Sequence, residues 1–396
     1  MSSGARRARA TFSSSVQFFK RSTFLRETAI TLVSILLAFG VGCIILWAAG
    51  YSIPAVFIGL WQGAFGGKLA LGQTLTKATP IILTSLSFLF AFRCGLFNIG
   101  AEGQMYVGAI TTAVVAAQLQ LPIIVHTIIA LFAGGLAGAF WGWIPGYLKA
   151  KRGVNEFVTT MMLSYVAIGL TDYLVAPRGP LHDPKYQANQ SARVALTAQF
   201  ARIMKPTQVS WAIIVAGLFV VVVWYYLFRT RSGYELRAVG QSLTAAEYGG
   251  VKTRRKLIFA LSAAGFLAGI AGAGEVLGTH FRFVDGFSPG YGWDGIAGGL
   301  IARAHPVGAI FSALLMGALR AGGMQVQRSG AAPADIAAVL QGLVIFFIIA
   351  PSLVRQMART AGLTVPQWIG RVARSATRSV GGRRRRVHGG KGRRTE

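Results

Sequence analysis

The chain has 396 residues, of which 53% are hydrophobic and only 13% are charged, and its mean hydropathy is +0.53. These values exclude a soluble protein, because the apolar residues come in runs of about twenty, the length that crosses a bilayer. The formal net charge is +28, from 40 Lys and Arg against 12 Asp and Glu. Two cysteines beside apolar runs and five scattered histidines exclude a disulfide framework and a zinc site. The composition predicts an integral membrane protein built from helices.

The apolar runs predict an all-α polytopic bundle with about ten membrane spans. In chain order, the expected spans are residues 28–50, 70–91, 98–119, 121–148, 155–175, 208–228, 257–279, 290–303, 305–325 and 333–354. The first span is too long for the apolar core of a signal peptide, so no cleavable leader is expected. Two spans, 98–119 and 290–303, are short or interrupted by glycine and begin with polar residues, so broken or short helices are expected there.

Two segments between predicted spans, residues 51–68 and 177–207, are expected to lie outside the cell. Residues 51–68 are predicted to form a short interfacial helix with Trp61 at the depth of the lipid headgroups. Residues 177–207 begin with "PRGPLHDP" and are predicted to form an ordered external loop.

The basic residues are concentrated in four stretches, 1–27, 149–152, 229–256 and 355–396. Basic loops stay on the cytoplasmic side of a membrane protein. We therefore expect a basic cytoplasmic segment over 1–27, a transmembrane domain over 28–354, and a basic cytoplasmic tail over 355–396 that is disordered. Both termini are then cytoplasmic. The tail is suited to contact with anionic lipid, and it lacks the interleaved aromatic residues of a nucleic-acid-binding segment.

Polar residues open two of the predicted spans. The stretch "NIGAEGQM" begins at Asn98 and places Glu102 and Gln104 near the start of a span, and "GYGWDGIAGG" places Asp294 within apolar sequence. A charged side chain at the membrane centre costs ~2.5–3.5 kcal/mol, so it normally faces a water-filled cavity or a partner. Two roles remain open. The side chains line a common polar cavity on a translocation path, or the carboxylates cap helix starts.

The segment 229–256 is too polar to span a membrane and too long for a minimal turn. Within it, Leu236, Val239, Leu243 and Ala246 recur at helical spacing and predict one amphipathic helix bounded by glycines. A helix this short is marginal in water and needs a surface on which to pack. The residue pattern leaves two surfaces open: the lipid headgroups, since the flanks are basic, and a cytoplasmic protein.

Several stretches together resemble the permeases of ATP-binding-cassette (ABC) importers, in the simple-sugar and nucleoside branch. They are "FRCGLFNIGAEGQMYVGA" (92–109), "GVNEFVTTMMLSYVA" (153–167), "GYELRAVGQSLTAAEYGGV" (233–251), "GYGWDGIAGGLIARAHPVGAIFSALLMGALRAGGMQ" (290–325) and "VLQGLVIF" (339–346). They occur in the expected order, and the wording of the first and fourth stretches is closest to purine-nucleoside-type permeases. Ser164, Ser242 and Gly249 depart from the residues frequent in that branch.

The resemblance implies a multi-pass permease of the plasma membrane with several partners. It would pair with a second permease, as a heterodimer, bind two cytoplasmic ABC ATPase subunits, and receive substrate from an extracytoplasmic binding lipoprotein. The chain has no GxxxxGK[ST] motif, so ATP hydrolysis is expected in the partners. We expect no enzyme activity, no catalytic residue, no cofactor and no metal ion. The implied function is import of a nucleoside or related simple sugar by alternating access.

Two other classes of function compete with the importer as explanations of this sequence. An ion-coupled secondary transporter of a small polar solute would also use broken helices and buried carboxylates, but it does not explain the segment 233–251. A membrane-embedded enzyme would need a nucleophile–base pair or a metal-binding cluster, and the sequence suggests neither.

The resemblance and the polar pattern together assign candidate residues to three roles. The translocation path is predicted to involve Asn98, Glu102, Gln104, Asn155, Glu156 and Asp294. Stacking on a nucleoside base is predicted for Phe97, Tyr106, Tyr291 and Trp293. Coupling to an ATPase is predicted for Glu235, Leu236, Arg237, Val239, Gly240, Leu243 and Ala246, with the apolar side chains docking into a groove and the charged ones at its rim. For Asn155 and Glu156, capping of their own helix remains the alternative.

Overall fold

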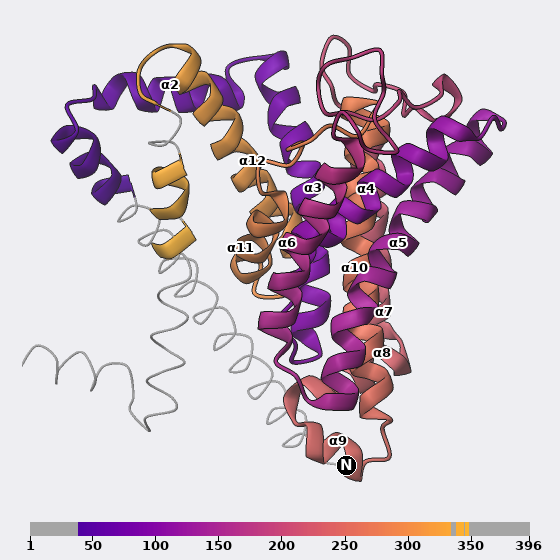
Figure 1. Ribbon diagram of the computed structural model, residues 1–396. Coiled ribbons are helices and arrows are strands. Elements are labelled where there is room, and N and C mark those ends of the chain that lie inside the picture. The colour runs from indigo at the N-terminus through magenta and orange to yellow at the C-terminus, as the bar shows by residue number, and fades with distance from the viewer. Residues whose placement is uncertain (1–38, 334–337, 344, 348–396) are drawn as a thin grey trace, which may run out of the picture. The chain divides into compact units, whose positions relative to one another are not determined.

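The computed structural model describes residues 39–333, 338–343 and 345–347. The chain divides into two units, and the larger, residues 42–342, carries every candidate residue named above (Figure 1). Within the described residues of this unit, the structure is helical with isolated β-bridges and no β-strand. The prediction of an all-α fold is confirmed.

The helices follow one another with short connections, apart from one long segment over residues 176–211. They are α2 (Ile53–Phe65), α3 (Lys68–Arg93), α4 (Ala101–Gln118), α5 (Ile123–Arg152), α6 (Glu156–Val175), α7 (Ala212–Arg229), α8 (Arg231–Gln241), α9 (Leu243–Tyr248), α10 (Thr253–Glu275), α11 (Tyr291–Ile301) and α12 (Pro306–Arg328). A π-helical turn, Val276–His280, extends α10, and a 3-10 turn, Leu196–Ala198, lies in the long segment.

Six described helices are long and apolar enough to cross a membrane: α3, α5, α6, α7, α12, and α10 with its extension, Thr253–His280. Helices α4 and α11 are not among them, which agrees with the short helices expected at 98–119 and 290–303. The expected spans 28–50 and 333–354 run into residues outside the described part of the chain. The polytopic helical bundle is therefore confirmed.

Helices α3 and α10 form the centre of this unit. In their apolar windows, 83% and 72% of the residues are buried, against 28% for α6 and α7, so the latter turn most of their surface outward. The most extensive packing joins α5 to α10. It depends on small residues, because a side chain at Gly138 would collide with the Gly265 carbonyl.

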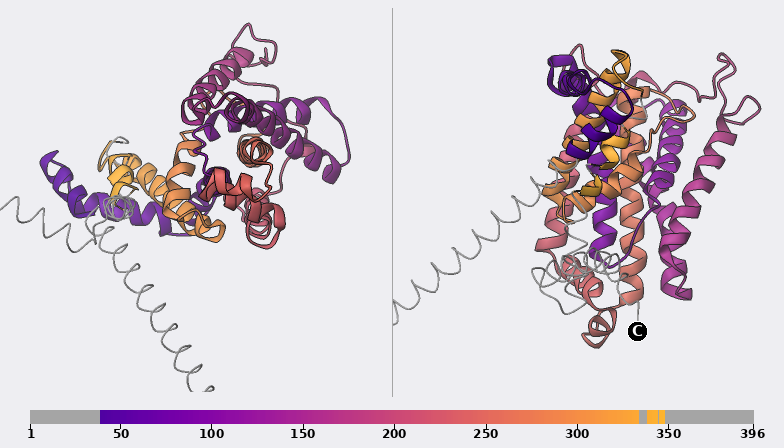
Figure 2. Two further views of the ribbon diagram at one scale, coloured as in Figure 1. Left: turned by 90° about the horizontal axis from the view of Figure 1, so that it is seen from below. Right: turned by 90° about the vertical axis from the view of Figure 1, so that its left-hand side faces the viewer.

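Two groups of elements lie at opposite ends of the bundle. Figures 1 and 2 show α8 and α9 at one end, and α2 with the 176–211 segment at the other. This is the arrangement that the predicted cytoplasmic segment 229–256 and external loop 177–207 require. The interfacial helix expected over 51–68 corresponds to α2. Which end faces the cytoplasm stays a prediction.

Candidate functional site

The start of α11 packs against the start of α4 in the interior of the bundle. The Oε2 atom of Glu102 accepts a hydrogen bond of 2.5 Å from the Gly292 backbone N–H, and Glu102 is only 2% exposed. A side chain at Gly292 would collide with the Glu102 backbone, so this glycine allows the close approach. The Ser288 hydroxyl accepts hydrogen bonds from the N–H groups of Gly290 and Tyr291, the two residues just before Gly292. The Glu102 carboxylate therefore caps another helix, α11, from the first turn of α4.

Asp294 joins three helices. Its Oδ2 atom accepts a hydrogen bond from the Arg320 guanidinium on α12, and its Oδ1 atom accepts one of 2.8 Å from Gln341 Nε2, in the helix that begins at Ala338. Arg320 also donates through Nη2 to the Pro289 carbonyl at 3.0 Å. Asp294 is 6% exposed, and this pairing offsets the cost of a charge inside an apolar bundle.

Asn98 and Gln104 form a separate amide pair in the turn that leads into α4. Asn98 Nδ2 donates to Gln104 Oε1 at 3.0 Å, and Gln104 Nε2 donates to Asn98 Oδ1 at 3.3 Å. Asn98 also donates to the Ser87 hydroxyl and accepts from the Gly100 N–H. Both amides are buried, so in this conformation they organise the turn, and a shared cavity with Glu102 and Asp294 stays a prediction.

Asn155 and Glu156 lie at the start of α6 and make local contacts. Asn155 Oδ1 accepts a hydrogen bond of 3.0 Å from the Phe157 N–H, as an N-cap residue does, and the Glu156 carboxylate pairs with Lys149 at 2.7 Å. These are the contacts that the capping alternative requires. A role of either side chain in translocation stays a prediction.

The four aromatic candidates have different surroundings. Tyr106 and Tyr291 are 4% and 1% exposed, whereas Phe97 and Trp293 are partly exposed. Tyr106 packs against two phenylalanines of the 281–290 loop, and Phe97 packs with phenylalanines of α3 and α6. The Tyr106 contacts belong to the core, whereas Phe97 packs with Phe92 and Phe157, which are 42% and 45% exposed, and stacking on a base stays a prediction.

A cavity of about 260 Å³ lies beside the Asp294 network. Its polar lining comes from Lys77, Arg320, Gln327 and Gln341. The Lys77 ammonium and the Arg320 guanidinium both lie over the Tyr291 ring, at 5.7 and 5.5 Å from its centroid. Sequence reasoning missed these side chains. The usable signal was a lone basic residue in each of two apolar spans, since a buried carboxylate needs a cationic partner.

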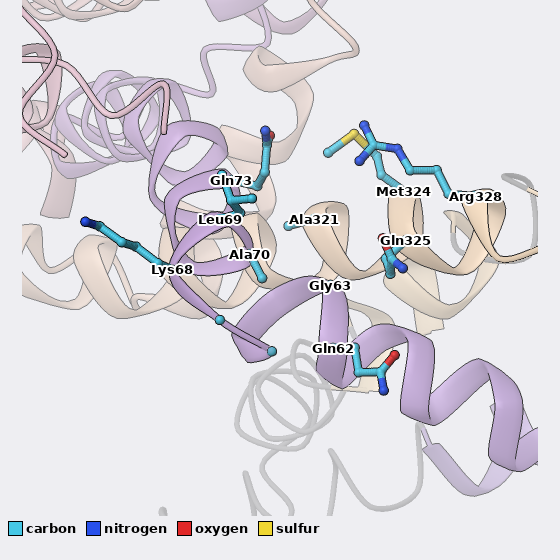
Figure 3. A pocket seen from close by; sticks show the side chains of 12 residues that line it. Gln62, Gly63, Lys68, Leu69, Ala70, Gln73, Ala321, Met324, Gln325 and Arg328 are labelled. Carbon is cyan, nitrogen blue, oxygen red and sulfur yellow. The ribbon is translucent and has the colours of Figure 1, made fainter. Parts of the chain in front are cut away.

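A larger cavity, of about 580 Å³, lies between α2, α3 and α12 (Figure 3). It is lined by Gln62, Gln73 and Gln325 and by the cations Lys68 and Arg328. Met324 lines both this cavity and the one beside Asp294. The two cavities are therefore adjacent and share one lining residue, Met324.

The segment 229–256 folds into two short helices instead of the single amphipathic helix expected. Ser242 is extended (φ −158°, ψ 114°), and its hydroxyl caps α9 by accepting a hydrogen bond from the Ala245 N–H at 3.3 Å. Serine is a favoured N-cap residue, which explains a new helix start at this position. The single-helix expectation is wrong: the first two of its apolar residues lie on α8 and the last two on α9.

Most of the expected coupling face packs against the chain's own bundle. Leu236, Val239 and Ala246 are 0%, 4% and 5% exposed, whereas Leu243 is 44% exposed. Gly240 packs closely against the turn that ends α3, where a side chain would collide with the Arg93 carbonyl. The expectation that all four apolar residues are available to a partner is therefore corrected, because three of them anchor the segment to the bundle.

The two charged residues of this segment are also engaged within the chain. Glu235 pairs with Lys256 at 3.0 Å and with Arg231 at 3.2 Å, which ties α8 to the start of α10. The hydrogen bond from Lys256, supported by Arg231, lowers the pKa of the Glu235 carboxyl. The Arg237 guanidinium lies over the Phe228 ring, 5.1 Å from its centroid. The segment is thus a structured extension of the bundle.

Comparison with known proteins identifies the type of molecule in which these features occur. Residues 70–349 match the family described as branched-chain amino acid transport system / permease component. A guanosine ABC transporter permease of Bacillus subtilis is 33% identical over 332 residues, which covers 84% of this chain and 95% of the relative. A glucose ABC transporter permease of Haloferax volcanii is 31% identical over 328 residues, with coverage of 80% and 86%.

A third relative gives the same result. A nucleoside ABC transporter permease of Lactococcus lactis is 31% identical over 342 residues, covering 84% of this chain and 93% of the relative. The matched residues include α4 and α11, nearly all of the α3 and α12 residues that line the two cavities, and the α8–α9 segment. The chain therefore belongs to the family of branched-chain amino acid transport system permease components, and within that family to the simple-sugar and nucleoside branch of ABC transporter permeases.

Proposed function

We propose that this chain is the membrane-spanning permease of an ABC importer that carries a nucleoside or a related simple sugar. The observation that carries this proposal is the pair of cavities that share Met324 and that carry amide and cationic side chains in their walls, inside a bundle of apolar helices. The relatives named for guanosine, nucleosides and glucose support the class of substrate. All three kinds of molecule present a ring with neighbouring hydroxyl groups, which polar cavity walls can bind.

Alternating access would use the hydrogen bonds at the start of α11. Glu102 on α4 and Arg320 on α12 hold that start from two sides, through Gly292 and Asp294. As α11 moves, contacts with water or with substrate hydroxyls can replace these hydrogen bonds, so that no buried polar group is left without a partner. Movement of α11 relative to α4 and α12 would then open the smaller cavity toward one membrane face or the other.

Energy would enter through the α8–α9 segment, which we place on the cytoplasmic side together with both termini. Its exposed large hydrophobic side chains are Tyr234 (66%), Leu243 (44%) and Tyr248 (95%), and we propose that an ATPase subunit binds them. The buried residues of α8 and the Glu235–Lys256 pair would transmit the ATPase movement to α10, which packs on α3, α4 and α5. A second permease and an extracytoplasmic binding lipoprotein complete the proposed transporter.

Uptake of labelled guanosine tests the proposal in a strain that lacks its own nucleoside importers and expresses this chain with its partner subunits. We expect uptake that unlabelled nucleosides compete, that a hydrolysis-deficient ATPase partner abolishes, and that an ionophore leaves intact. Uptake that continues with the deficient ATPase but stops with the ionophore would support an ion-coupled secondary transporter instead. The absence of uptake for every nucleoside and simple sugar would overturn the proposed substrate class.

A further inference from the structure

We propose that Gln341, Arg320 and Lys77 form a site for two neighbouring hydroxyl groups of a sugar ring, and that the transporter selects its substrate there by the sugar rather than by the base. This inference rests on the proposed function and assigns its substrate-reading residues. The three side chains come from α3, α12 and the helix that begins at Ala338, and all line the cavity of about 260 Å³.

Asp294 determines which atoms of this site face a ligand. It accepts hydrogen bonds from Gln341 Nε2 at 2.8 Å and from Arg320 Nε. Because the Gln341 amide nitrogen is engaged in this way, the carbonyl oxygen Oε1 is the atom that it can offer as an acceptor. Arg320 has a second bond from Nη2 to the Pro289 carbonyl, and these bonds use two of the five guanidinium N–H groups, so others can donate to a ligand. Asp294 thus acts as a positioning residue for both.

The site therefore offers one hydrogen-bond acceptor, Gln341 Oε1, beside two cationic donors, Lys77 and Arg320. Lys77 and Arg320 are held at 5.7 and 5.5 Å over the Tyr291 ring, so both donors are oriented before a ligand enters. Each hydroxyl of a vicinal diol donates one hydrogen bond and accepts others, so a pair of hydroxyls matches an acceptor placed next to donors.

The size of the cavity is compatible with a sugar ring. Its volume, about 260 Å³, is close to the lower end of the range for pockets that hold small molecules, roughly 300 Å³. A site that reads the sugar and leaves the base outside also explains how similar chains can serve both nucleosides and glucose.

The test compares guanosine with 2′-deoxyguanosine, which lacks one hydroxyl of the diol, in proteoliposomes that contain the complete purified transporter with its binding protein. The measured quantity is kcat/KM for guanosine divided by kcat/KM for 2′-deoxyguanosine. A site that hydrogen-bonds a substrate hydroxyl discriminates strongly against an analogue lacking it, so we expect the Gln341→Leu change to lower this ratio by roughly 10-fold or more. The same binding protein serves every variant, so its own selectivity cancels in the comparison between variants.

Two further variants make the result decisive. Lys77→Met removes a donor without touching Asp294, so it should also lower the ratio and will answer the question if Gln341→Leu fails to assemble. Gln118→Leu is the matched control, because it removes the same amide from an exposed position at the end of α4 that lines neither cavity, and it should leave the ratio at the wild-type value.

The outcomes separate this inference from the proposed function. If Gln341→Leu and Lys77→Met lower kcat/KM equally for both nucleosides, or leave both values as in wild type, the ratio does not change. Either result would overturn the diol site, and equal losses would show a structural role. Preference of the wild type for a sugar phosphate over the free sugar would overturn it in favour of an anion site. If wild-type transporter carries neither nucleosides nor simple sugars, the proposed function itself fails.

Discussion

The α4–α11 centre and the α8–α9 end of the bundle both carry charged side chains, but they satisfy them differently. Glu102 and Asp294 are 2% and 6% exposed, and each bonds to a different helix. At the other region, Arg231 is 93% exposed where it pairs with Glu235, one turn away on the same helix. A buried charge that loses its partner is costly, whereas an exposed pair contributes little. Changes at the centre should therefore affect folding and transport together, and changes at α8–α9 should affect partner binding with little effect on folding.

The largest effect is expected for Asp294→Ala. The change leaves the Arg320 guanidinium, which is partly exposed in the cavity, without its carboxylate, and a hydrogen bond between charged groups is worth ~1.5–3 kcal/mol. We expect a clear fall in the thermal unfolding temperature of the detergent-purified chain and loss of uptake. The double variant Asp294→Ala/Arg320→Ala should be more stable than the single one, because it removes the unpaired charge. Additive losses in the double variant would show that the two side chains do not act as a pair.

The next effect concerns Tyr248 on α9, which is 95% exposed and so has almost no part in the fold. If an ATPase binds this surface, Tyr248→Ala removes an aromatic anchor and should cost ~2 kcal/mol of binding, roughly a thirty-fold loss of affinity. Leu243→Asp should act in the same direction. The measurement is retention of the ATPase by affinity-purified permease, together with the unfolding temperature, which should not change for Tyr248→Ala.

Leu196→Asp is the matched control for this surface. Leu196 is 80% exposed and lies in the segment at the opposite end of the bundle, so the change should leave ATPase retention unaltered. Equal ATPase retention by wild type, Tyr248→Ala and Leu243→Asp would place the docking surface elsewhere and remove the functional contrast between the two regions.

A smaller effect is expected for Glu102→Gln. The amide can still accept the hydrogen bond from Gly292, but it no longer places a negative charge at the start of α11, where such a charge is worth up to ~2 kcal/mol in partly buried geometry. Uptake should fall several-fold at equal abundance in the membrane. Glu102→Ala should be worse, because it leaves a buried N–H without an acceptor. Wild-type uptake by both variants would limit Glu102 to a dispensable cap.

The comparison also shows what the sequence could predict at each region. Glu102 and Asp294 could be recognised as special, because a carboxylate in an apolar span must have a partner or a cavity. Their partners could not be identified, since Gly292 lies 190 residues from Glu102 and Arg320 lies 26 residues from Asp294. Such contacts depend on how the helices pack, and the apolar runs that predict the helices do not specify that packing.

At α8–α9 the sequence predicted helix but not the break in it. The spacing of the four apolar residues fits one continuous helix, and only the N-cap preference of Ser242 indicates two. Burial could not be predicted either, because an apolar helix face has the same pattern whether it packs on its own chain or on a partner. The structure decides this for Leu236 and Val239, which are buried within the chain.

The smallest effect is expected for the pH dependence of the Glu235 pair. The hydrogen bond from Lys256 lowers the pKa of the folded-state carboxyl below its unfolded value of about 4.3. The pair therefore contributes its full stabilisation above that unfolded pKa and loses it as the pH falls through the lower, folded-state pKa. In thermal unfolding of the purified chain, wild type should exceed Glu235→Gln by a small, constant margin near neutral pH, and the margin should shrink below about pH 4. A margin that stays the same in acid, or that grows there, would show that Glu235 stabilises the fold by packing and not by its charge.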